Sequence, residues 1–410
     1  MNYTAYRLYL YPFEPLHFGY GGQRGNVLPT LPYIPGRALR GALAGWANKN
    51  GILPDTGSEF MKIFGEMTTP GADAYTVSFP FCYLNGMPPA PLSLFEVKGG
   101  GGHPRHMPLR QNTYRLAWRR KSWASFDPAD YVLDFLCRDE WPAEIEEYNL
   151  QPLKQAVVED GKLYPAHSPA TLLRAAHDED TGRVGEGGES GGLHAEEVLP
   201  RAEVTGRSPF SEHFYSGDLV FDGDNKRLAS LFKALNDASQ PFRDAKNEYD
   251  WKQAGRRNLV FLGRRLTPAA VFVSETVKPD VPECQPGDTR VTLTFTSDAR
   301  TADRNTNPHP FSPSLWQSCP GLAGAEKIRC FSARASTNGA VHVPGTSFSP
   351  LGTVPVLQAG SCVYLEKAKL EVINELAWKG FMGTGGDTRN GFGRFIVNDS
   401  VHKIDMEQGA

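Results

Sequence analysis

Hydrophobic and polar positions along the chain predict a succession of strands and helices. Residues 3–13 (YTAYRLYLYPF) alternate and are rich in Tyr and Leu, which predicts a strand. In the segment 35–51, the apolar side chains Leu39, Leu43 and Trp46 recur at helical spacing, so we expect a helix there.

The same order of elements occurs twice. The first copy has a strand at 214–221, a helix at 228–237, a Gly/Arg segment at 261–266 and a strand at 270–275. The second copy has a strand at 359–366, a helix at 368–380, a glycine-rich segment at 383–395 and a last strand after it. Further strands are expected at 74–84 and 289–299. The repeat predicts two related α+β units at 1–280 and 281–410, the first enlarged by insertions.

Composition narrows the class of protein without naming a partner. The 410 residues are 40% hydrophobic and 22% charged, with 42 Gly and 32 Pro, as expected of a globular chain with many turns. The net charge of −3 means that a nucleic-acid binder would have to act through local patches. The six cysteines form no CxxC pair, and neither a signal peptide nor a membrane span is evident. We expect a soluble, cytoplasmic protein with free thiols.

The glycine-rich segment is the first candidate site. It contains five glycines in thirteen residues, which lets backbone N–H groups approach a phosphate closely. Charge-assisted contacts would come from Arg389 and Arg394. The alternative is a tight structural turn. The residues predicted to contact RNA here are Gly385, Gly386, Arg389, Gly391, Phe392, Gly393 and Arg394.

The start of the first helix is the second candidate. A helix N-terminus offers unpaired N–H groups to an anion, and Arg37 and Arg40 flank it. The loop just upstream, 17–25, adds glycines and Arg24. The alternative is that the arginines are merely solvated. We predict that Arg37, Arg40, Arg389 and Arg394 share one positive surface across the junction of the two units.

A basic and aromatic insertion, 98–126, is the third candidate. It has seven Lys and Arg residues and no acid, and Tyr114, Trp118 and Trp123 lie among them. Cations follow phosphates and aromatic rings stack on unpaired bases. The alternatives are a solvated charge run with core tryptophans, or a surface that docks an acidic neighbour. The predicted RNA contacts here are Arg110, Arg115, Trp118, Arg119, Arg120 and Lys121.

Catalytic and metal chemistry have weaker signals. Asp178, Glu179 and Asp180 lie in an acidic, glycine-rich loop, 178–192, but three successive side chains do not converge on one ion without a turn. The ten histidines form no HxxxH, HxH or HExxH pattern, and no partner can be assigned to His17, His103 or His106. We therefore predict no catalytic residue, no metal and no cofactor.

Four segments together resemble the RAMP superfamily of CRISPR effector proteins, most closely the large two-unit RAMP subunit of type III-D complexes. They are PYIPGRALRGALAGW at 32–46, HDEDTGRVGEGGESGGLHAEEVLPRAEV at 177–204, AGSCVY at 359–364 and GGDTRNGFGRF at 385–395. The order of these segments matches the family. The first unit departs from it, because FLGRRL at 261–266 replaces a full glycine-rich loop.

The resemblance implies two ferredoxin-like (RRM-like) units with loop and hairpin insertions, 178–192 belonging to a thumb-like hairpin. It implies a non-catalytic subunit that binds crRNA, near its 5′ handle, in antiviral defence. Partners would be the backbone RAMP subunits, the large polymerase-like subunit and, indirectly, target RNA. The alternative is an endoribonuclease that processes or cleaves RNA. On this hypothesis, Val at Gly391 and Gly393 would impair complex assembly while the isolated protein stays folded.

Overall fold

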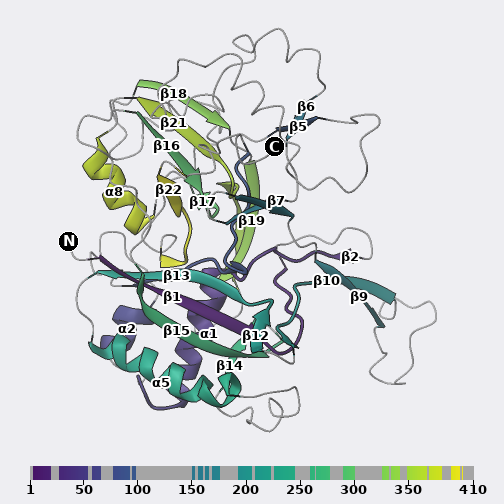
Figure 1. The fold of residues 1–410 in the computed structure, drawn as a ribbon. Coiled ribbons are helices and arrows are strands. Elements are labelled where there is room, and N and C mark those ends of the chain that lie inside the picture. Colours follow the sequence, from purple (N-terminus) through teal and green to yellow (C-terminus); the bar gives the residue numbers. More distant parts are fainter. Residues whose placement is uncertain are drawn as a thin grey trace.

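The computed structural model contains two larger antiparallel sheets, the first accompanied by several helices and the second by a helix near the carboxyl end of the chain, together with smaller strand groups (Figure 1). It describes residues 3–19, 27–53, 58–65, 77–92, 95–97, 150–152, 156–159, 162–165, 169–175, 193–205, 208–222, 226–244, 259–263, 265–277, 290–300, 326–331, 334–341, 349–366, 369–380, 389–397 and 399. The basic insertion 98–126 and the acidic loop 178–192 lie outside these residues.

The first sheet has the order β14-β15-β1-β13-β3, with β4 also paired to β13. Its strands are β1 (Tyr3–Pro12), β3 (Val77–Ser78), β4 (Tyr83–Leu84), β13 (Tyr215–Asp222), β14 (Val260–Leu262) and β15 (Thr267–Val277). Helix α1 (Gly36–Lys49) lies between β1 and β3 in the chain, and α5 (Lys226–Arg243) lies between β13 and the pair β14 and β15. The strand predicted at 3–13 and the helix predicted at 35–51 are confirmed.

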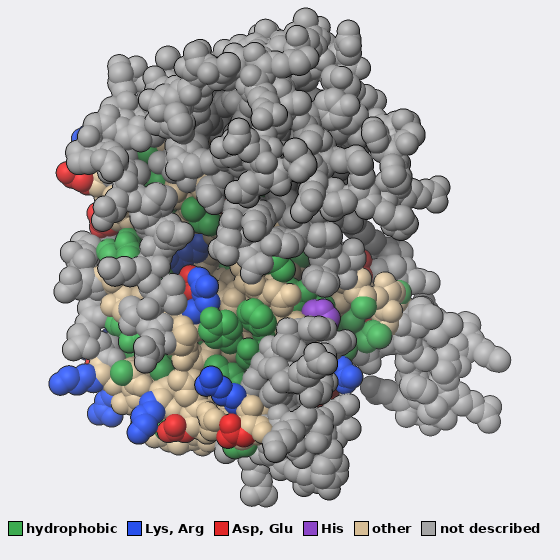
Figure 2. All heavy atoms as spheres, viewed as in Figure 1, with side chains coloured by type: hydrophobic (Ala, Val, Ile, Leu, Met, Phe, Trp, Pro, Cys, Tyr) green, Lys and Arg blue, Asp and Glu red, His purple; other side chains and the backbone are tan. Residues whose placement is uncertain are grey.

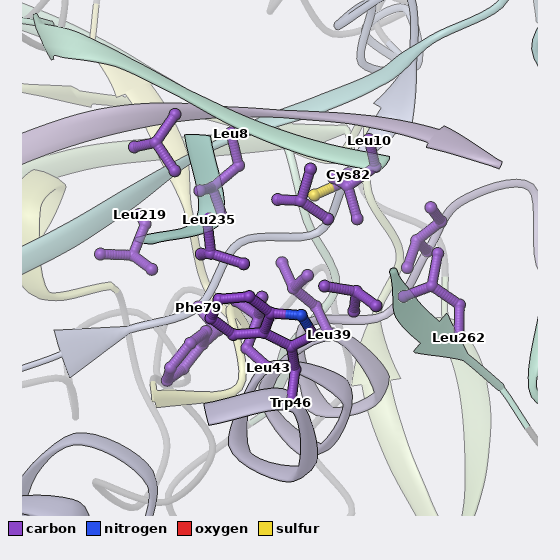
Figure 3. Packing of buried hydrophobic residues seen from close by; sticks show 14 of the residues in the cluster. Leu8, Leu10, Leu39, Leu43, Trp46, Phe79, Cys82, Leu219, Leu235 and Leu262 are labelled. Carbon is purple, nitrogen blue, oxygen red and sulfur yellow. The ribbon is translucent and has the colours of Figure 1, made fainter. Parts of the chain in front are cut away.

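The core of this half lies between the sheet and the helices because each contributes one apolar face. The buried side chains of α1 include Leu39, Leu43 and Trp46, and Figure 3 shows them grouped beneath Leu8 and Leu10 of β1. Leu8 and Leu10 are two residues apart, so the period of the strand places both on the same face. The residues that recur at helical spacing in the sequence therefore form the buried face of α1.

The second sheet has the order β18-β21-β16-β22. Its strands are β16 (Arg290–Phe295), β18 (Glu326–Phe331), β21 (Cys362–Glu366) and β22 (Phe395–Val397), and α8 (Leu370–Lys379) connects β21 to β22. The two sheets share part of their arrangement. In each, the entry strand (β1 or β16) lies beside the strand that precedes the helix (β13 or β21); its other neighbour is β22 in the second sheet and β15 in the first, where the additional strand β14 comes between α5 and β15 and pairs with β15 at the sheet edge. The segments read as a repeat, 214–275 and 359–397, occupy equivalent places in these arrangements.

Smaller elements surround the two sheets. One is the short helix α2 (Ser58–Phe64). Two groups have three strands each: β2 (Val27–Leu28), β9 (Ala170–Ala175) and β10 (Leu193–Val198) form the first, and β17 (Ala299–Arg300), β19 (Arg334–Val341) and β20 (Ser349–Leu357) form the second. The remaining strands form pairs: β5 (Phe95–Val97) with β6 (Leu150–Pro152), β7 (Ala156–Glu159) with β8 (Lys162–Pro165), and β11 (Glu203–Thr205) with β12 (Ser208–Glu212). Strands β9 and β10 pair antiparallel and flank the acidic loop, so the base of the predicted hairpin is present.

Three predicted elements differ in extent. The strand expected at 74–84 is two short strands, β3 and β4, because Pro80 interrupts the ladder. Helix α5 extends beyond the predicted 228–237 at both ends. Residues 261–266 contain the end of β14 and a turn. Among the described residues, Cys82 and Cys362 are buried free thiols, and no helix there is long and apolar enough to cross a membrane.

Candidate nucleic-acid interface

The described part of the glycine-rich loop, 389–394, packs against backbone of the first half of the chain. Gly391 has φ +85°, which glycine adopts without a Cβ clash. A Cβ at this position would lie 2.4 Å from the carbonyl oxygen of Phe79 and 3.0 Å from the nitrogen of Phe81. The amide of Phe79 also donates to the carbonyl of Arg389 at 2.8 Å. Glycine is therefore required at 391 by a neighbouring protein segment.

Two glycines of the first half complete this close packing. A Cβ at Gly36, the first residue of α1, would lie 2.3 Å from the carbonyl oxygen of Asn390. A Cβ at Gly217 in β13 would lie 2.5 Å from the carbonyl oxygen of Phe81. Thus the helix entry, the glycine-rich loop and β13 approach the segment 79–81 from three sides. The two candidate sites read from the sequence meet here.

Arg40 and Arg389 converge, but inside the protein. Their side chains are buried, at 6% and 3% exposure. Arg40 Nη1 donates to the carbonyls of Phe64 and Gly65 at 3.3 and 3.2 Å, and Arg389 Nη2 donates to the carbonyl of Lys62 at 2.8 Å. These carbonyls end α2, where the helix dipole is negative and intrahelical partners are missing. The prediction of a solvent-facing positive surface is wrong for these two arginines.

Arg394 ends the loop at another helix terminus. Its Nη1 donates to the carbonyl of Trp378 near the end of α8, and its amide donates to Ser297 Oγ at 2.8 Å. The Nε and Nη2 atoms are buried and have no hydrogen-bond partner among the described residues. Burial lowers the pKa of Arg394 to about 10, and the negative charge of Asp218 partly offsets this by raising it. The guanidinium therefore stays charged at neutral pH.

A buried carboxylate, Asp298, ties the junction together. Its Oδ2 accepts from the hydroxyl of Tyr33 at 2.9 Å, and its Oδ1 accepts from the amide of Ala359 at 2.9 Å. Its carbonyl accepts from the amide of Gly393 at 2.8 Å. Desolvation raises the pKa of Asp298, and the two hydrogen bonds to the carboxylate partly offset that rise. One residue therefore connects the helix entry, the AGS segment and the glycine-rich loop.

Aromatic side chains enclose this carboxylate. Tyr33 stacks on Phe81 with ring centroids 4.5 Å apart, and Phe392 meets the ring of Phe81 edge-on at 5.1 Å. The hydroxyl of Tyr83 donates to the carbonyl of Thr296 at 2.5 Å. Burial raises the pKa of both tyrosines well above the ordinary value, so they act as donors. Phe392, predicted to contact RNA, has a protein ring as its neighbour.

The remaining predicted residues divide into two groups. Arg37 is half-buried in the first turn of α1. The others lie outside the described residues: Arg24, Arg110, Arg115, Trp118, Arg119, Arg120, Lys121, Gly385 and Gly386. Among the described residues, no group of three or more His, Cys, Asp or Glu side chains could hold a metal ion. The acidic triplet 178–180 is not among them.

Sequence reasoning missed Asp298, Tyr33 and Tyr83. Asp298 lies 265 positions from Tyr33, and nothing in the segment TSDA distinguishes a buried carboxylate from a polar turn residue. Tyr33, within the helix-entry segment, was a signal in the sequence that could have indicated a buried hydrogen-bond partner. A polar aromatic side chain at the edge of an apolar run usually has a hydrogen-bond partner when it is buried.

Comparison with solved structures found chains that match over most of this chain at low identity and low structural similarity. No family model and no curated protein matches the chain. A chain from a cryo-EM structure of the type III-B Cmr-β complex bound to cognate target RNA and AMPPnP is 12% identical, covering 90% of this chain and 88% of that one with a TM-score of 0.42. A chain from the apo Cmr-β structure is 15% identical, with 66% and 97% coverage and a TM-score of 0.31. The CRISPR-associated protein Cas6 is 8% identical, with 97% and 99% coverage and a TM-score of 0.29.

Proposed function

We propose that the chain is a non-catalytic, crRNA-binding RAMP subunit of a type III CRISPR effector, of the III-D kind, built from two ferredoxin-like units. The proposal is supported by the second sheet, whose strands lie in the order second, third, first, fourth with a helix between the third and fourth, and by β3, β13, β1 and β15 of the first sheet, which follow the same order with β14 added at the edge. It would hold the crRNA near its 5′ handle and dock neighbouring subunits, including the polymerase-like one.

The observation that carries this proposal is the set of partners of Asp298. Three of the four segments that resemble RAMP proteins bind this one residue, through Tyr33, Ala359 and Gly393. The fourth, 177–204, lies within the first half, where the amide of Ala202 donates to the carbonyl of Pro12. Three segments that are far apart in the sequence thus meet at one junction, which supports the proposal that they belong to one family pattern.

Within this proposal the arginines have different roles. Arg40 and Arg389 fix the junction, since their donors contact the end of α2. Direct contact with RNA is assigned to Arg37 and to the predicted residues outside the described part of the chain. In the glycine-rich loop, the contact with the RNA backbone is assigned to Gly385 and Gly386, which precede the segment packed at the junction.

The test uses the purified full chain and a labelled RNA carrying the repeat sequence, with and without magnesium or manganese. A mobility shift without cleavage is expected. The variant Asp178→Ala, Glu179→Ala, Asp180→Ala is expected to bind equally. Metal-dependent cleavage that this variant loses would replace the proposal with the endoribonuclease alternative, and absence of any shift would overturn RNA binding.

A further inference from the structure

We propose that His17, Arg265 and Leu266 form a ribonucleotide subsite in which His17 Nε2 accepts a hydrogen bond from a ribose 2′-hydroxyl. This inference rests on the proposed RNA binding and adds a subsite that the predicted contacts do not include. The three residues come from two segments, the one after β1 and the turn between β14 and β15. The adjacent strand β10 supports both segments.

The support is a buried carboxylate, Glu196, in β10. Its side chain is 1% exposed, and its Oε2 lies 2.7 Å from Arg265 Nη2. Its Oε1 lies 3.5 Å from His17 Nδ1. A carboxylate so buried is costly unless it is paired, so the position of Arg265 beside it is well determined.

The protonation of His17 follows from its hydrogen bond. Nδ1 lies 2.9 Å from the carbonyl oxygen of Glu197. A carbonyl oxygen only accepts, so Nδ1 carries the hydrogen and Nε2 of the neutral ring is an acceptor. The side chain is 19% exposed, and Nε2 has no hydrogen-bond partner among the described residues.

Glycine keeps this nitrogen accessible. A Cβ at Gly19 would lie 3.2 Å from His17 Nε2, and therefore any other residue at position 19 would partly cover it. Gly19 also forms an isolated bridge with Thr30, which fixes the backbone next to His17. An oriented imidazole acceptor suits a hydroxyl donor.

The turn beside His17 supplies a cation and an apolar tip. The side chain of Arg265 is 42% exposed although its Nη2 is held by Glu196, so the residue remains accessible from solvent. Leu266 is 64% exposed and has φ +53°, a conformation that non-glycine residues seldom adopt. Gly263 has φ +68°, and a Cβ at this position would lie 3.3 Å from the ring of Phe18 and 3.6 Å from the carbonyl oxygen of His17, so the turn packs closely against this segment.

These groups match one ribonucleotide. The guanidinium would bind the phosphate, Leu266 would pack against the base or ribose, and His17 would distinguish RNA from DNA through the 2′-hydroxyl. A neighbouring protein could also cover an exposed leucine. We favour RNA because three different groups lie together here. The guanidinium suits a phosphate, the oriented acceptor suits a ribose hydroxyl, and the apolar side chain suits a base or ribose.

Affinity of the full chain for a repeat-sequence RNA and for the DNA of the same sequence tests the subsite. His17→Asn keeps a donor to the Glu197 carbonyl and removes the outer acceptor, so RNA affinity should fall about tenfold with DNA affinity unchanged. His17→Gln places an amide oxygen near the Nε2 position and should retain most of the RNA affinity. Equal effects of His17→Asn on both nucleic acids, or none, would overturn the role of His17.

The turn is tested by salt dependence and folding. Arg265→Gln should weaken RNA and DNA alike and reduce the slope of log affinity against log salt by about 0.7, the value for one phosphate of a single strand. Lys233→Gln, on the exposed side of α5, is the matched loss of charge and should leave the slope unchanged. Figure 2 shows cationic side chains along the lower edge over α5, away from the centre of the described surface.

Leu266→Asn provides a second test of the turn if Arg265→Gln fails to fold. Asn tolerates positive φ better than Leu, so the melting temperature should not fall while RNA affinity does. Unchanged RNA affinity combined with lost co-purification of neighbouring subunits would assign the turn to a protein contact. Wild-type protein that binds neither nucleic acid overturns the proposed function as well, whereas wild-type binding with unaffected variants overturns the subsite alone.

Discussion

At the scale of single residues, Gly391 is determined by its protein neighbours. It combines φ +85° with a Cβ position 2.4 Å from the Phe79 carbonyl oxygen. The sequence suggested that Val here would spare the isolated fold. The structure reverses that expectation, because a Cβ collides with backbone that has no flexible end to move.

Gly391→Ala is expected to lower the free energy of unfolding by about 2–4 kcal/mol, from a disfavoured backbone conformation and a backbone clash. Urea denaturation of the full chain followed by circular dichroism measures it. Gly41→Ala is the matched control, because a Cβ at Gly41 has open space within 4 Å and lies inside α1. That control should be neutral or stabilising by about 0.5–1 kcal/mol. Equal effects of the two substitutions would contradict the packing at the junction.

Asp298 predicts a pH dependence with a definite sign. Its folded-state pKa is raised by desolvation above the ordinary 3.8, so the folded protein retains this proton to higher pH than the unfolded chain. Its contribution to stability is greatest below 3.8 and declines as pH rises through the folded-state pKa. Asp298→Asn removes this dependence. Urea unfolding of both proteins should show the wild type losing stability relative to the variant across that window, and a relative gain would contradict the raised pKa.

At the scale of elements, helix α2 is fixed by two arginines from opposite ends of the chain. Arg389 donates to the carbonyl of Lys62, and Arg40 donates to the carbonyls of Phe64 and Gly65, at and just beyond its carboxyl end. A seven-residue helix is too short to be stable by itself, so these contacts and its packing hold it in place. The glycine-rich loop therefore contributes to the first half of the protein through Arg389.

Replacement of each arginine by Met keeps the apolar stem and removes the donors. Each single variant should lose about 2–4 kcal/mol of unfolding free energy, since buried carbonyls are left without partners. Because both arginines act on the same helix end, the double variant should lose less than the sum, with a coupling of about 0.5 kcal/mol or more. A double-mutant cycle by chemical denaturation measures the coupling. Strict additivity would mean that the two side chains stabilise α2 independently.

At the scale of the whole molecule, the boundary near residue 280 separates two sheets but not two independent cores. The described part of the glycine-rich loop, 389–394, belongs to the second half by sequence, yet Arg389 and Gly391 complete the packing around Phe79 in the first half. Tyr33 and Tyr83 in turn donate to Asp298 and Thr296 of the second half. Each half leaves polar and apolar groups unsatisfied without the other.

A fragment of residues 1–280 is accordingly expected to lack a cooperative thermal transition, and addition of fragment 281–410 should restore it. Circular dichroism melts of the separate and mixed fragments, with size-exclusion chromatography of the mixture, provide the measurement. If fragment 1–280 alone unfolds cooperatively, with the melting temperature of the full chain, then the glycine-rich loop is dispensable for the first half.

The sequence by itself determined the periodic elements of this protein. Leu39, Leu43 and Trp46 recur every three or four residues, and this local spacing identifies the buried face of α1 wherever the helix packs. The order strand, helix, strand was also read twice, at 214–275 and 359–397, from the periodicity of each element in turn. Each such periodicity is local, within about twenty residues of chain, where it is informative.

Only the tertiary structure decided what the glycines and arginines contact. A glycine permits close approach by RNA or by protein, and the sequence is the same in both cases. The carbonyls that receive Arg40 and Arg389, and the carboxylate that joins Tyr33, Ala359 and Gly393, come from distant segments. Partners separated by hundreds of residues have no local signature, because their encounter depends on how the two sheets pack together.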